Sequence, residues 1–515
     1  MPIVQQGSIN TTALVVPDLY VQIVPPQTLL LNGVPTDILG IVGSASWGPV
    51  GLPVTIGTMA QYAAAFGPVM PRAFDLGTPI ATAVQQGAQN FRCVRVTDGT
   101  DTPASLTLQT AITLTARYTG SLGSGISVVL STGSKANTWR ITVALSASTP
   151  EIFDNIAGTG AALWQAIVSA INIGNGALRG ASQTVVASYA GGTAVPVAGS
   201  FTFTTGTPGT DGASGVTAAT LIGSDSVPRA GMYALRGQGC SVALLSDATD
   251  VTQYTTQAEF GLSEGIYMIL AGPAGDTTAN AVATKASAGL DSYAAKLMFG
   301  DWLYWNDQTN AMLRLVSPQG FAARRLVNLS PEQSSLNKQL YSIAGSQRSG
   351  SVASGQSSTY ATADLQALFQ AGIDVICNPQ PGGTYWGVRC GHNSSSNAAV
   401  NGDNYTRLTN YIAATLSAGM GVYVGSVINS TLFQNIRATL LSFLQAMLGE
   451  GLLGSTDGSQ PFAVICDTTN NPQTRTALGY VQADVQVQFQ GINEKFIVNV
   501  EGGQTVQVSH QTLTS

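Results

Sequence analysis

GYVQADVQVQFQG, residues 479–491, and INEKFIVNVEGGQTVQVS, residues 492–509, alternate apolar and polar residues almost without interruption. This period of two is typical of half-buried β-strands, and it predicts one strand over 481–490 and a second over 496–500. Strands at the end of a chain carry unpaired backbone donors and acceptors, and an isolated hairpin is only marginally stable. The two strands therefore need a partner, either in the same subunit or in another molecule.

The composition describes a folded protein with a polar but weakly charged surface. The chain has 515 residues, enough for about three domains of ~150 residues each. Charged residues make up 9% of it, against roughly 25% in ordinary soluble domains, while 44% of the chain is apolar. Such a surface suits dense packing of identical subunits, because packing penalises like charge and unpaired buried charge. A Gly- and Thr-rich β protein selected for robustness would have the same composition.

Charge and hydropathy argue against two classes of partner. A net charge of −6 without a cluster of Lys and Arg is unlike a nucleic-acid-binding surface. No apolar run reaches the length of about 18 residues that a membrane-spanning helix needs. The first residues, MPIVQQ, lack the basic region and apolar run of a secretory signal. We therefore expect a protein without membrane insertion that is made in a cytoplasm.

The five cysteines fit no metal-binding spacing, and they are Cys93, Cys240, Cys377, Cys390 and Cys466. In a reducing compartment we expect buried, reduced thiols. The odd number leaves open a disulfide between subunits, which equal migration on reducing and non-reducing denaturing gels would exclude. No metal site is predicted from these residues.

The inventory of chemically active residues is too thin for an enzyme. His392 and His510 are the two histidines, and neither has a second histidine near it in the sequence. No GxxxxGK[ST] loop is present, and the acidic residues are scattered. Residues 467–471, DTTNN, supply oxygen ligands for a cation, but they match an Asx turn better. We expect no catalytic residue, no cofactor and no metal.

Composition and periodicity divide the chain into six parts. Short extended runs broken by prolines fill the first thirty residues, and from Gly99 short strands alternate with Gly, Ser and Thr loops. From Cys240 strand and helix alternate, which indicates an α/β layer. The predicted parts are an N-terminal arm (1–30), a first α/β segment (31–97), a β-rich insertion (98–236), an α/β domain (237–357), a C-terminal domain (358–491) and a C-terminal arm (492–515).

Several single elements are predicted. The apolar periodicity indicates helices over 280–296, over 403–419, and from a cap at Ser430 to Gly449. Residues 373–377, IDVIC, are predicted as one strand. We interpret one stripe of the last helix as core, and it is formed by Leu432, Phe433, Ile436, Leu440, Phe443, Leu444 and Met447.

Six runs of residues match one known family in order and spacing, and together they cover nearly the whole chain. They are IVGSASWGP (41–49), FRCVRV (91–96), LTARYTGSLG (114–123), GTDG (209–212), SYAA (292–295) and VICD (464–467). The first two resemble the N-terminal domain of contractile tail sheath proteins, which are found in phages and related injection machines. The next two are similar to the inserted β-domain of that family, the fifth to its α/β domain and the last to its C-terminal domain.

The sequence departs from the family pattern in two places. Residues 338–345 stand where many sheaths have a Trp- and Lys-rich motif, so the local packing there is not implied by the resemblance. The chain also continues past Val500, beyond the usual last strand of the family. The resemblance therefore implies nothing about residues 505–515.

The resemblance implies a fold, a function and partners. The fold would be a multidomain α/β and α+β protein with sheath-type α/β core domains, a β-rich inserted domain and extended β-arms at both termini. Sheath subunits polymerise helically as stacked rings around an inner tail tube, and contraction drives that tube through the host cell envelope. The implied partners are copies of the chain, the inner tube protein, and baseplate and tail terminator proteins. The implied place is a virion tail that assembles in the host cytoplasm.

Strand exchange is the link between subunits that the resemblance implies. The arms would add strands to the C-terminal sheet of neighbouring subunits, which is β-augmentation between identical chains. The strand over 481–490 would be the host, and the segment from Phe496 onward would be given away. The expected exchange residues are Val15, Val16, Tyr20, Val21, Val481, Val485, Val487, Phe496, Val498 and Val500.

Alternatives stay open at this point. The sheath of a tailocin or of a bacterial contractile injection system would share these sequence features, and neighbouring genes for a capsid and a terminase would separate the cases. A secreted β-rich adhesin shares the composition, but it requires a secretion signal and either clustered aromatic residues or paired carboxylates. A soluble α/β enzyme predicts a small oligomer with saturable turnover.

Overall fold

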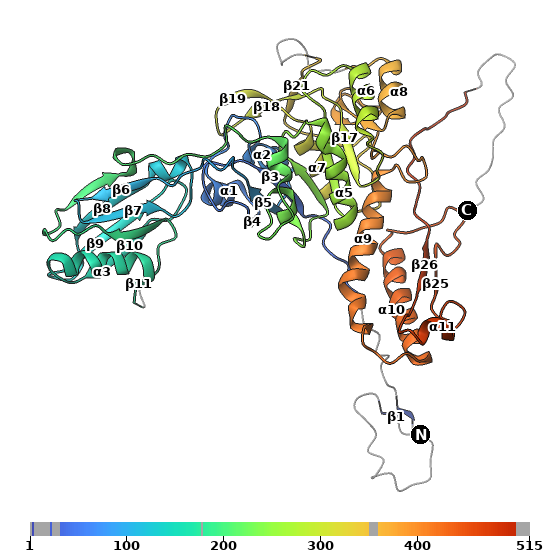
Figure 1. The fold of residues 1–515 in the computed structure, drawn as a ribbon. Coiled ribbons are helices and arrows are strands. Elements are labelled where there is room, and N and C mark those ends of the chain that lie inside the picture. Colours follow the sequence, from blue (N-terminus) through green and yellow to red (C-terminus); the bar gives the residue numbers. More distant parts are fainter. Residues whose placement is uncertain (1–2, 5–20, 23–30, 177–178, 350–358, 501–515) are drawn as a thin grey trace, which may run out of the picture.

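The computed structural model describes residues 3–4, 21–22, 31–176, 179–349 and 359–500. Three bodies lie in a row: a β-rich domain at one end, an α/β core in the middle, and helices with a small sheet at the other end (Figure 1). Buried apolar residues form one cluster in the β-rich domain, one on each face of the central sheet, and one in the C-terminal domain.

A seven-stranded sheet forms the centre of the α/β core. Its strands are β3 (Leu39–Gly43), β4 (Pro53–Ile56), β5 (Phe91–Arg95), β15 (Val242–Leu245), β16 (Tyr267–Ala271), β17 (Ala295–Met298) and β22 (Ile373–Asp374). Their order is β22-β17-β16-β15-β3-β5-β4, parallel except for β4. Strands buried on both faces are mostly apolar, which explains runs such as VALL in β15.

Helices cover both faces of this sheet. They are α1 (Met59–Phe66), α2 (Gly77–Gln85), α4 (Ala218–Ile222), α5 (Tyr254–Glu264), α6 (Thr278–Ala288), α7 (Gln319–Val327) and α8 (Thr362–Gln370). Helices α1, α2 and α7 contribute to one apolar cluster, and α4, α5, α6 and α8 contribute to the other. Two small sheets complete the core, made of β18 (Leu303–Asp307), β19 (Met312–Val316) and β21 (Ile343–Ser346), and of β20 (Gln339–Leu340), β23 (Ile376–Cys377) and β24 (Trp386–Val388).

The β-rich domain contains two antiparallel sheets and one long helix. One sheet has β6 (Ser105–Leu108), β7 (Ile112–Ala116) and β13 (Val185–Tyr189), and the other has β8 (Ser127–Thr132), β9 (Trp139–Ala144), β10 (Glu151–Ile156) and β14 (Gly199–Thr202). Helix α3 (Gly160–Ile173) packs on β13, and the short pair β11 (Gly174–Asn175) and β12 (Arg179–Gly180) follows it. Alternate residues of the strands, as in β7, are buried in one shared core.

The C-terminal domain consists mainly of two helices that lie side by side and a two-stranded sheet (Figure 1). Its elements are α9 (Asp403–Gly419), α10 (Ser430–Gly449), β25 (Phe462–Ile465), α11 (Gln473–Thr476) and β26 (Asp484–Val487). The predicted stripe of α10 is buried as core, and both helices have the predicted bounds. The cap of α10 is Asn429 and not Ser430, because the Asn429 side chain accepts the Leu432 N–H at 2.8 Å. No helix among the described residues is long and apolar enough to cross a membrane.

Two further strands lie near the start of the chain. β1 (Ile3–Val4) pairs in parallel with β2 (Val21–Gln22). The rest of the predicted N-terminal arm lies outside the described residues.

Two domain boundaries differ from those expected. Val216, Leu221 and Met232 pack in the α/β core, so the β-rich domain ends near residue 211 and not at 236. Leu368 of α8 and Ile373 of β22 belong to the same core, although the boundary at 357 assigns them to the C-terminal domain. Both boundaries were predicted from changes in composition along the chain. Composition does not indicate which distant segments pack together, so it could not place these segments in the α/β core.

Two predicted elements are also wrong. The helix expected over 280–296 ends at Ala288, where Gly289 takes a left-handed conformation with φ 65°, and Lys296 lies in β17. The strand expected over 373–377 is two strands, β22 and β23, which belong to different sheets. Short apolar runs fit a buried strand or a buried helix equally well, which explains the first error.

Candidate functional site

The small C-terminal sheet is the element around which the candidate site is built. β25 pairs antiparallel with β26, and Phe462 lies opposite Val487 while Val464 lies opposite Val485. These four side chains belong to the apolar cluster that α10 supplies. Ala463 and Ile465, which alternate with the buried residues of β25, are exposed. One face of the sheet is therefore fixed to α10, and the other faces solvent.

A pair of asparagines holds the start of β26 in place. Asn471 exchanges two hydrogen bonds with the backbone of Gln482, at 2.6 and 2.8 Å, and Asn470 Nδ2 donates to Asp484 Oδ2 at 2.9 Å. Asp467 Oδ1 accepts the Thr469 N–H at 2.8 Å. The Asx-turn interpretation of residues 467–471 is therefore confirmed, and the turn positions a strand.

Both outer edges of the sheet are open. Within the described residues, β25 and β26 pair only with each other. A two-stranded sheet is marginal without further support, and unpaired strand edges are templates for another strand. The site therefore offers two places at which an extended segment can add.

The segment that follows β26 is unpaired and has exposed apolar side chains at alternate positions, as expected of a strand that adds to an open edge. Residues 488–500 form no strand, and the side chains of Phe496, Val498 and Val500 are 82%, 63% and 85% exposed. A hairpin between 481–490 and 496–500 does not form in the subunit: β26 pairs with β25, and residues 496–500 pair with no described strand. Three apolar side chains at alternate positions are thus left without a partner among the described residues.

The remaining predicted exchange residues are divided between the sheet and the start of the chain. Val481, Val485 and Val487 pack partly buried on the C-terminal core, so their side chains hold this segment on that core. Val21 lies in β2. Val15, Val16 and Tyr20 lie outside the described residues.

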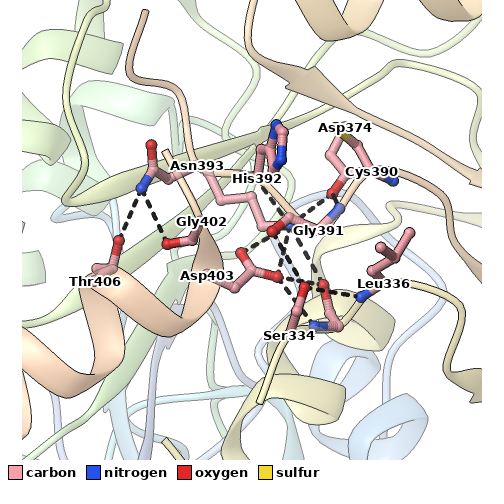
Figure 2. Close-up of polar contacts among 12 residues, drawn as sticks. Ser334, Leu336, Asp374, Cys390, Gly391, His392, Asn393, Gly402, Asp403 and Thr406 are labelled. Atoms are coloured by element: carbon pink, nitrogen blue, oxygen red, sulfur yellow. Dashed lines mark hydrogen bonds and ion pairs between the residues drawn. The ribbon is translucent and has the colours of Figure 1, made fainter. Parts of the chain in front are cut away.

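A buried ionic cluster joins the C-terminal domain to the α/β core, and it surrounds the amino end of α9 (Figure 2). Lys296 Nζ contacts Asp374 Oδ2 at 2.7 Å and Asp403 Oδ1 at 3.0 Å, and all three side chains are at most 1% exposed. Tyr267 donates to Asp403 Oδ1 at 2.6 Å, and Ser335 donates to Asp403 Oδ2 at 2.5 Å. The cluster connects β16, β17 and β22 of the sheet with the first residue of α9.

The electrostatics of this cluster favour the charged forms. Burial lowers the pKa of Lys296, but the carboxylates of Asp374 and Asp403 outweigh burial and hold that pKa above its usual range. Burial raises the pKa of Asp403, but Lys296 and the hydroxyl donors outweigh it, so the pKa is lowered. Breaking such a pair from one side leaves an uncompensated buried charge. The cluster therefore fixes the position of α9 only as a complete set.

No sequence pattern predicted this cluster, although Lys296 and Asp374 each stand out in their surroundings. Lys296 lies in the apolar run AAKLMF, and Asp374 lies in IDVIC. A charged residue inside a buried apolar strand needs a partner. Nothing in the sequence states that the partner of Lys296 is Asp403, 107 residues further along the chain.

A second joint links the α/β core to the β-rich domain. Arg95, at the end of β5 and fully buried, donates to the carbonyls of Gly48 (2.7 Å), Thr119 (2.8 Å) and Asp211 (3.2 Å). Arg72 pairs with the Asp211 carboxylate at 2.5 Å. The Arg95 side chain thus ties three segments, two of which belong to the β-rich domain.

Two carboxyls lie near this joint, Asp75, which is fully buried, and Asp247, which is half-buried and accepts the Phe74 N–H at 3.2 Å. Asp75 Oδ2 accepts the N–H and the hydroxyl of Thr78, both at 2.8 Å, while its Oδ1 has no partner among the described residues. Burial raises the pKa of Asp75 to about 7, against the hydrogen bonds from Thr78 and the charge of Arg72. Burial likewise raises the pKa of Asp247 to about 6.

The substitution Asp75→Asn is expected to stabilise the protein at pH 8 and to change its stability little at pH 5. Folded protein keeps a proton on Asp75 that the unfolded chain releases near pH 4. The contribution of Asp75 to the free energy of unfolding is therefore complete below pH 4 and is lost as pH rises through about 7. The free energy of unfolding falls by up to about 1.4 kcal/mol per pH unit in that window. Urea unfolding at both pH values measures it, with the exposed Glu259→Gln as control. An equal effect of Asp75→Asn at both values would contradict this assignment.

All five cysteines are buried free thiols. Burial raises the pKa of Cys240 and of Cys377 to about 12, and a thiol of high pKa is a poor nucleophile. This favours the reduced state over the disulfide between subunits, which would require one thiol to become exposed.

Comparison with known proteins gives a likeness in fold. No family model and no curated protein matches the chain. Among solved structures, the sheath tail protein of Listeria innocua matches with a TM-score of 0.60 and 13% identity, over 86% of this chain and 90% of that one. The sheath tail protein of Desulfitobacterium hafniense matches with a TM-score of 0.56 and 14% identity, over 86% and 93%.

A third structure is the contracted sheath complex of an extracellular contractile injection system, PVC. It matches with a TM-score of 0.54 and 10% identity, over 96% of this chain and 99% of that one. The resemblance noted in the sequence is thus confirmed for the fold, over nearly the whole length. The chain has the mixed α/β fold of contractile tail sheath proteins.

Proposed function

We propose that this chain is the structural subunit of a contractile tail sheath, which polymerises helically around an inner tail tube and contracts to drive the tube through the host cell envelope. The observation that carries this proposal is the likeness to sheath structures over nearly the full length of both chains, including one in a contracted state. The proposed partners are copies of the chain, the inner tube protein, and baseplate and terminator proteins.

Strand exchange is the proposed link between subunits. The sheet of β25 and β26 has two open edges, and each chain has two terminal segments that could occupy edges on neighbours. A strand of five residues such as 496–500 adds about five hydrogen bonds at ~1 kcal/mol net each, on the order of 5 kcal/mol before the cost of ordering. Links of this strength, repeated along a polymer, would keep subunits connected while their larger surfaces rearrange.

The roots of the two arms lie at opposite ends of α9, which supports links on two sides of each subunit. Leu31 packs against the carboxyl end of the helix, where a Cβ on Gly419 would come within 2.0 Å of Leu31 Cδ2. At the amino end, Asn404 Nδ2 donates to the carbonyl of Gln490 at 3.0 Å. A helix of 17 residues is roughly 25 Å long at about 1.5 Å per residue. Helix α9 would thus act as a spacer between the two links.

Contraction requires an extended state that is metastable. Contacts of the extended lattice would hold this state behind a kinetic barrier until a signal from the baseplate releases it. The arms would persist through the change, because the links need not break for subunits to rotate.

A contractile injection system is the second candidate. The likeness to the PVC sheath covers 96% of this chain, against 86% for the two sheath tail proteins. Genes for a capsid and a terminase beside the gene of this chain would favour a phage tail, and their absence would favour an injection system or a tailocin.

Electron microscopy of the purified chain, alone and co-expressed with the tube protein encoded beside it, tests the proposal. We expect hollow cylinders of uniform diameter, with the tube inside when it is present. Monodisperse particles at high protein concentration, with and without the tube protein, would contradict the proposed function.

A further inference from the structure

The seven residues that follow β26 are attached to the rest of the subunit, unlike the segment beyond them. The Gln488 N–H donates to the carbonyl of Pro461 at 2.7 Å. The ring of Phe489 packs edge-on against Tyr405, with centroids 5.8 Å apart, and Tyr405 packs in the same way on Tyr293. The first two contacts tie residues 488–490 to the loop before β25 and to helix α9, and Tyr405 in turn connects them to Tyr293 of the α/β core.

The last of these contacts is an ion pair or hydrogen bond between His392 and Glu494. Nε2 of His392 lies 2.6 Å from Glu494 Oε1, and the two side chains are 17% and 37% exposed. The amide nitrogen of Asn401 lies 3.4 Å from Nδ1 of the same ring. The pair is ionic when the ring is protonated and a hydrogen bond when it is neutral, so either form holds Glu494.

The loop that carries His392 is itself held by residues of the buried ionic cluster, among them Asp374 (Figure 2). The carbonyl of His392 accepts from Lys296 Nζ at 3.0 Å. The N–H groups of Cys390 and Gly391 donate to the Asp374 carboxylate at 2.9 and 2.7 Å. Glu494 is therefore attached to a loop that the buried ionic cluster holds on the central sheet.

Beyond Glu494 the attachment ends. Residues 495–500 make no hydrogen bond to any other described residue, and Phe496 and Ile497 are 82% and 81% exposed. The change from a fixed to a free segment thus falls between Glu494 and Lys495.

We propose that residues 488–494 are a fixed root of the C-terminal arm, that His392 and Glu494 are its positioning residues, and that the arm pivots at Lys495. The root sets the point and direction from which the exchanged strand leaves. A pull on that strand is transmitted through Glu494 and His392 to the ionic cluster, and so to the sheet of the α/β core. This inference rests on the proposed role of 496–500 as an exchanged strand.

Limited digestion of the full chain with trypsin, followed by mass spectrometry, tests the root. Arg475 and Lys495 are the last two cleavage sites in the sequence, so the release of 496–515 relative to 476–515 reports opening of the root with an internal reference. Loss of one contact of about 1 kcal/mol raises the population of the open root, and thus the relative rate, about fivefold. We expect this for His392→Ala and for Glu494→Ala.

Three further variants make the result specific to the pair. Glu494→Gln keeps an acceptor and is expected to stay close to wild type, and Glu450→Ala removes an exposed carboxylate elsewhere. The double variant His392→Ala, Glu494→Ala is expected to have the same relative cleavage rate as each single variant, because either substitution alone already removes the contact. Unchanged cleavage in both single variants, or multiplied effects in the double one, would overturn the fixed root.

Polymerisation tests the proposed function separately from the digestion. The Ala variants are expected to polymerise at a raised critical concentration, because a loosened arm meets the neighbouring edge less often. A critical concentration equal to that of wild type would contradict the positioning role. Wild-type protein that never polymerises would overturn the proposed function, while the digestion result would still decide whether the root is fixed.

Discussion

Deletion of residues 496–515 is expected to leave a folded, soluble monomer that no longer forms cylinders. The segment makes no hydrogen bond with other described residues up to Val500, so the subunit loses little when it is removed. The polymer, in contrast, would lose one exchanged strand per subunit, on the order of 5 kcal/mol per link. Sedimentation and electron microscopy measure assembly, and circular dichroism checks the fold. Deletion of residues 1–24 is expected to act in the same way at the other arm.

Point variants on the two faces of the segment provide the control. An added strand presents alternate side chains to opposite faces, so Phe496, Val498 and Val500 share one face and Ile497 and Asn499 share the other. Replacing the three residues of the first face by Ala should impair assembly more than replacing the two of the second. Normal cylinders from either deletion variant would disprove the strand-exchange account.

The substitution Lys296→Met is expected to destabilise the protein by about 3–5 kcal/mol, because it leaves Asp374 and Asp403 buried without their cation. The first transition in urea unfolding measures this loss. We also expect the position of α9 to become less defined. Spin labels at Ser287→Cys on α6 and Gln445→Cys on α10, both exposed sites, should give a narrow distance distribution in the parent chain and a broad one in the variant.

A neutral version of the same cluster is the matched control. The triple variant Lys296→Met, Asp374→Asn and Asp403→Asn removes all three charges at once, and it should recover most of the lost stability. If Lys296→Met had a free energy of unfolding within about 1 kcal/mol of that of the parent chain, and an unchanged distance distribution, the cluster would not hold α9.

The sequence predicted those parts of the fold in which a local pattern decides the structure. The bounds of α9 and α10 follow from their amphipathic periodicity, and the alternation at the end of the chain identified both β26 and the exposed segment after Gly491. The strand was shorter than expected, because it pairs over only four residues with β25.

Contacts between distant segments could not be predicted in this way. Lys296, Asp374 and Asp403 lie far apart in the sequence, and the first of them was assigned to a helix that ends eight residues earlier, at Ala288. The fixed part of the arm was missed for a related reason. The sequence assigned residues 488–490 to the predicted strand and residues 492–494 to the arm, and only the contacts of Phe489 and Glu494 show that they form one attached segment.

A helical reconstruction of the cylinders by electron cryo-microscopy tests the central claim most directly. The account predicts that residues 496–500 of one subunit run along a free edge of β25 or β26 in a neighbouring subunit, with hydrogen bonds to its backbone. It also predicts that residues 488–494 stay on their own subunit, with Glu494 against His392. Cylinders in which 496–500 folds back onto its own subunit, with both edges of the sheet unoccupied, would contradict it.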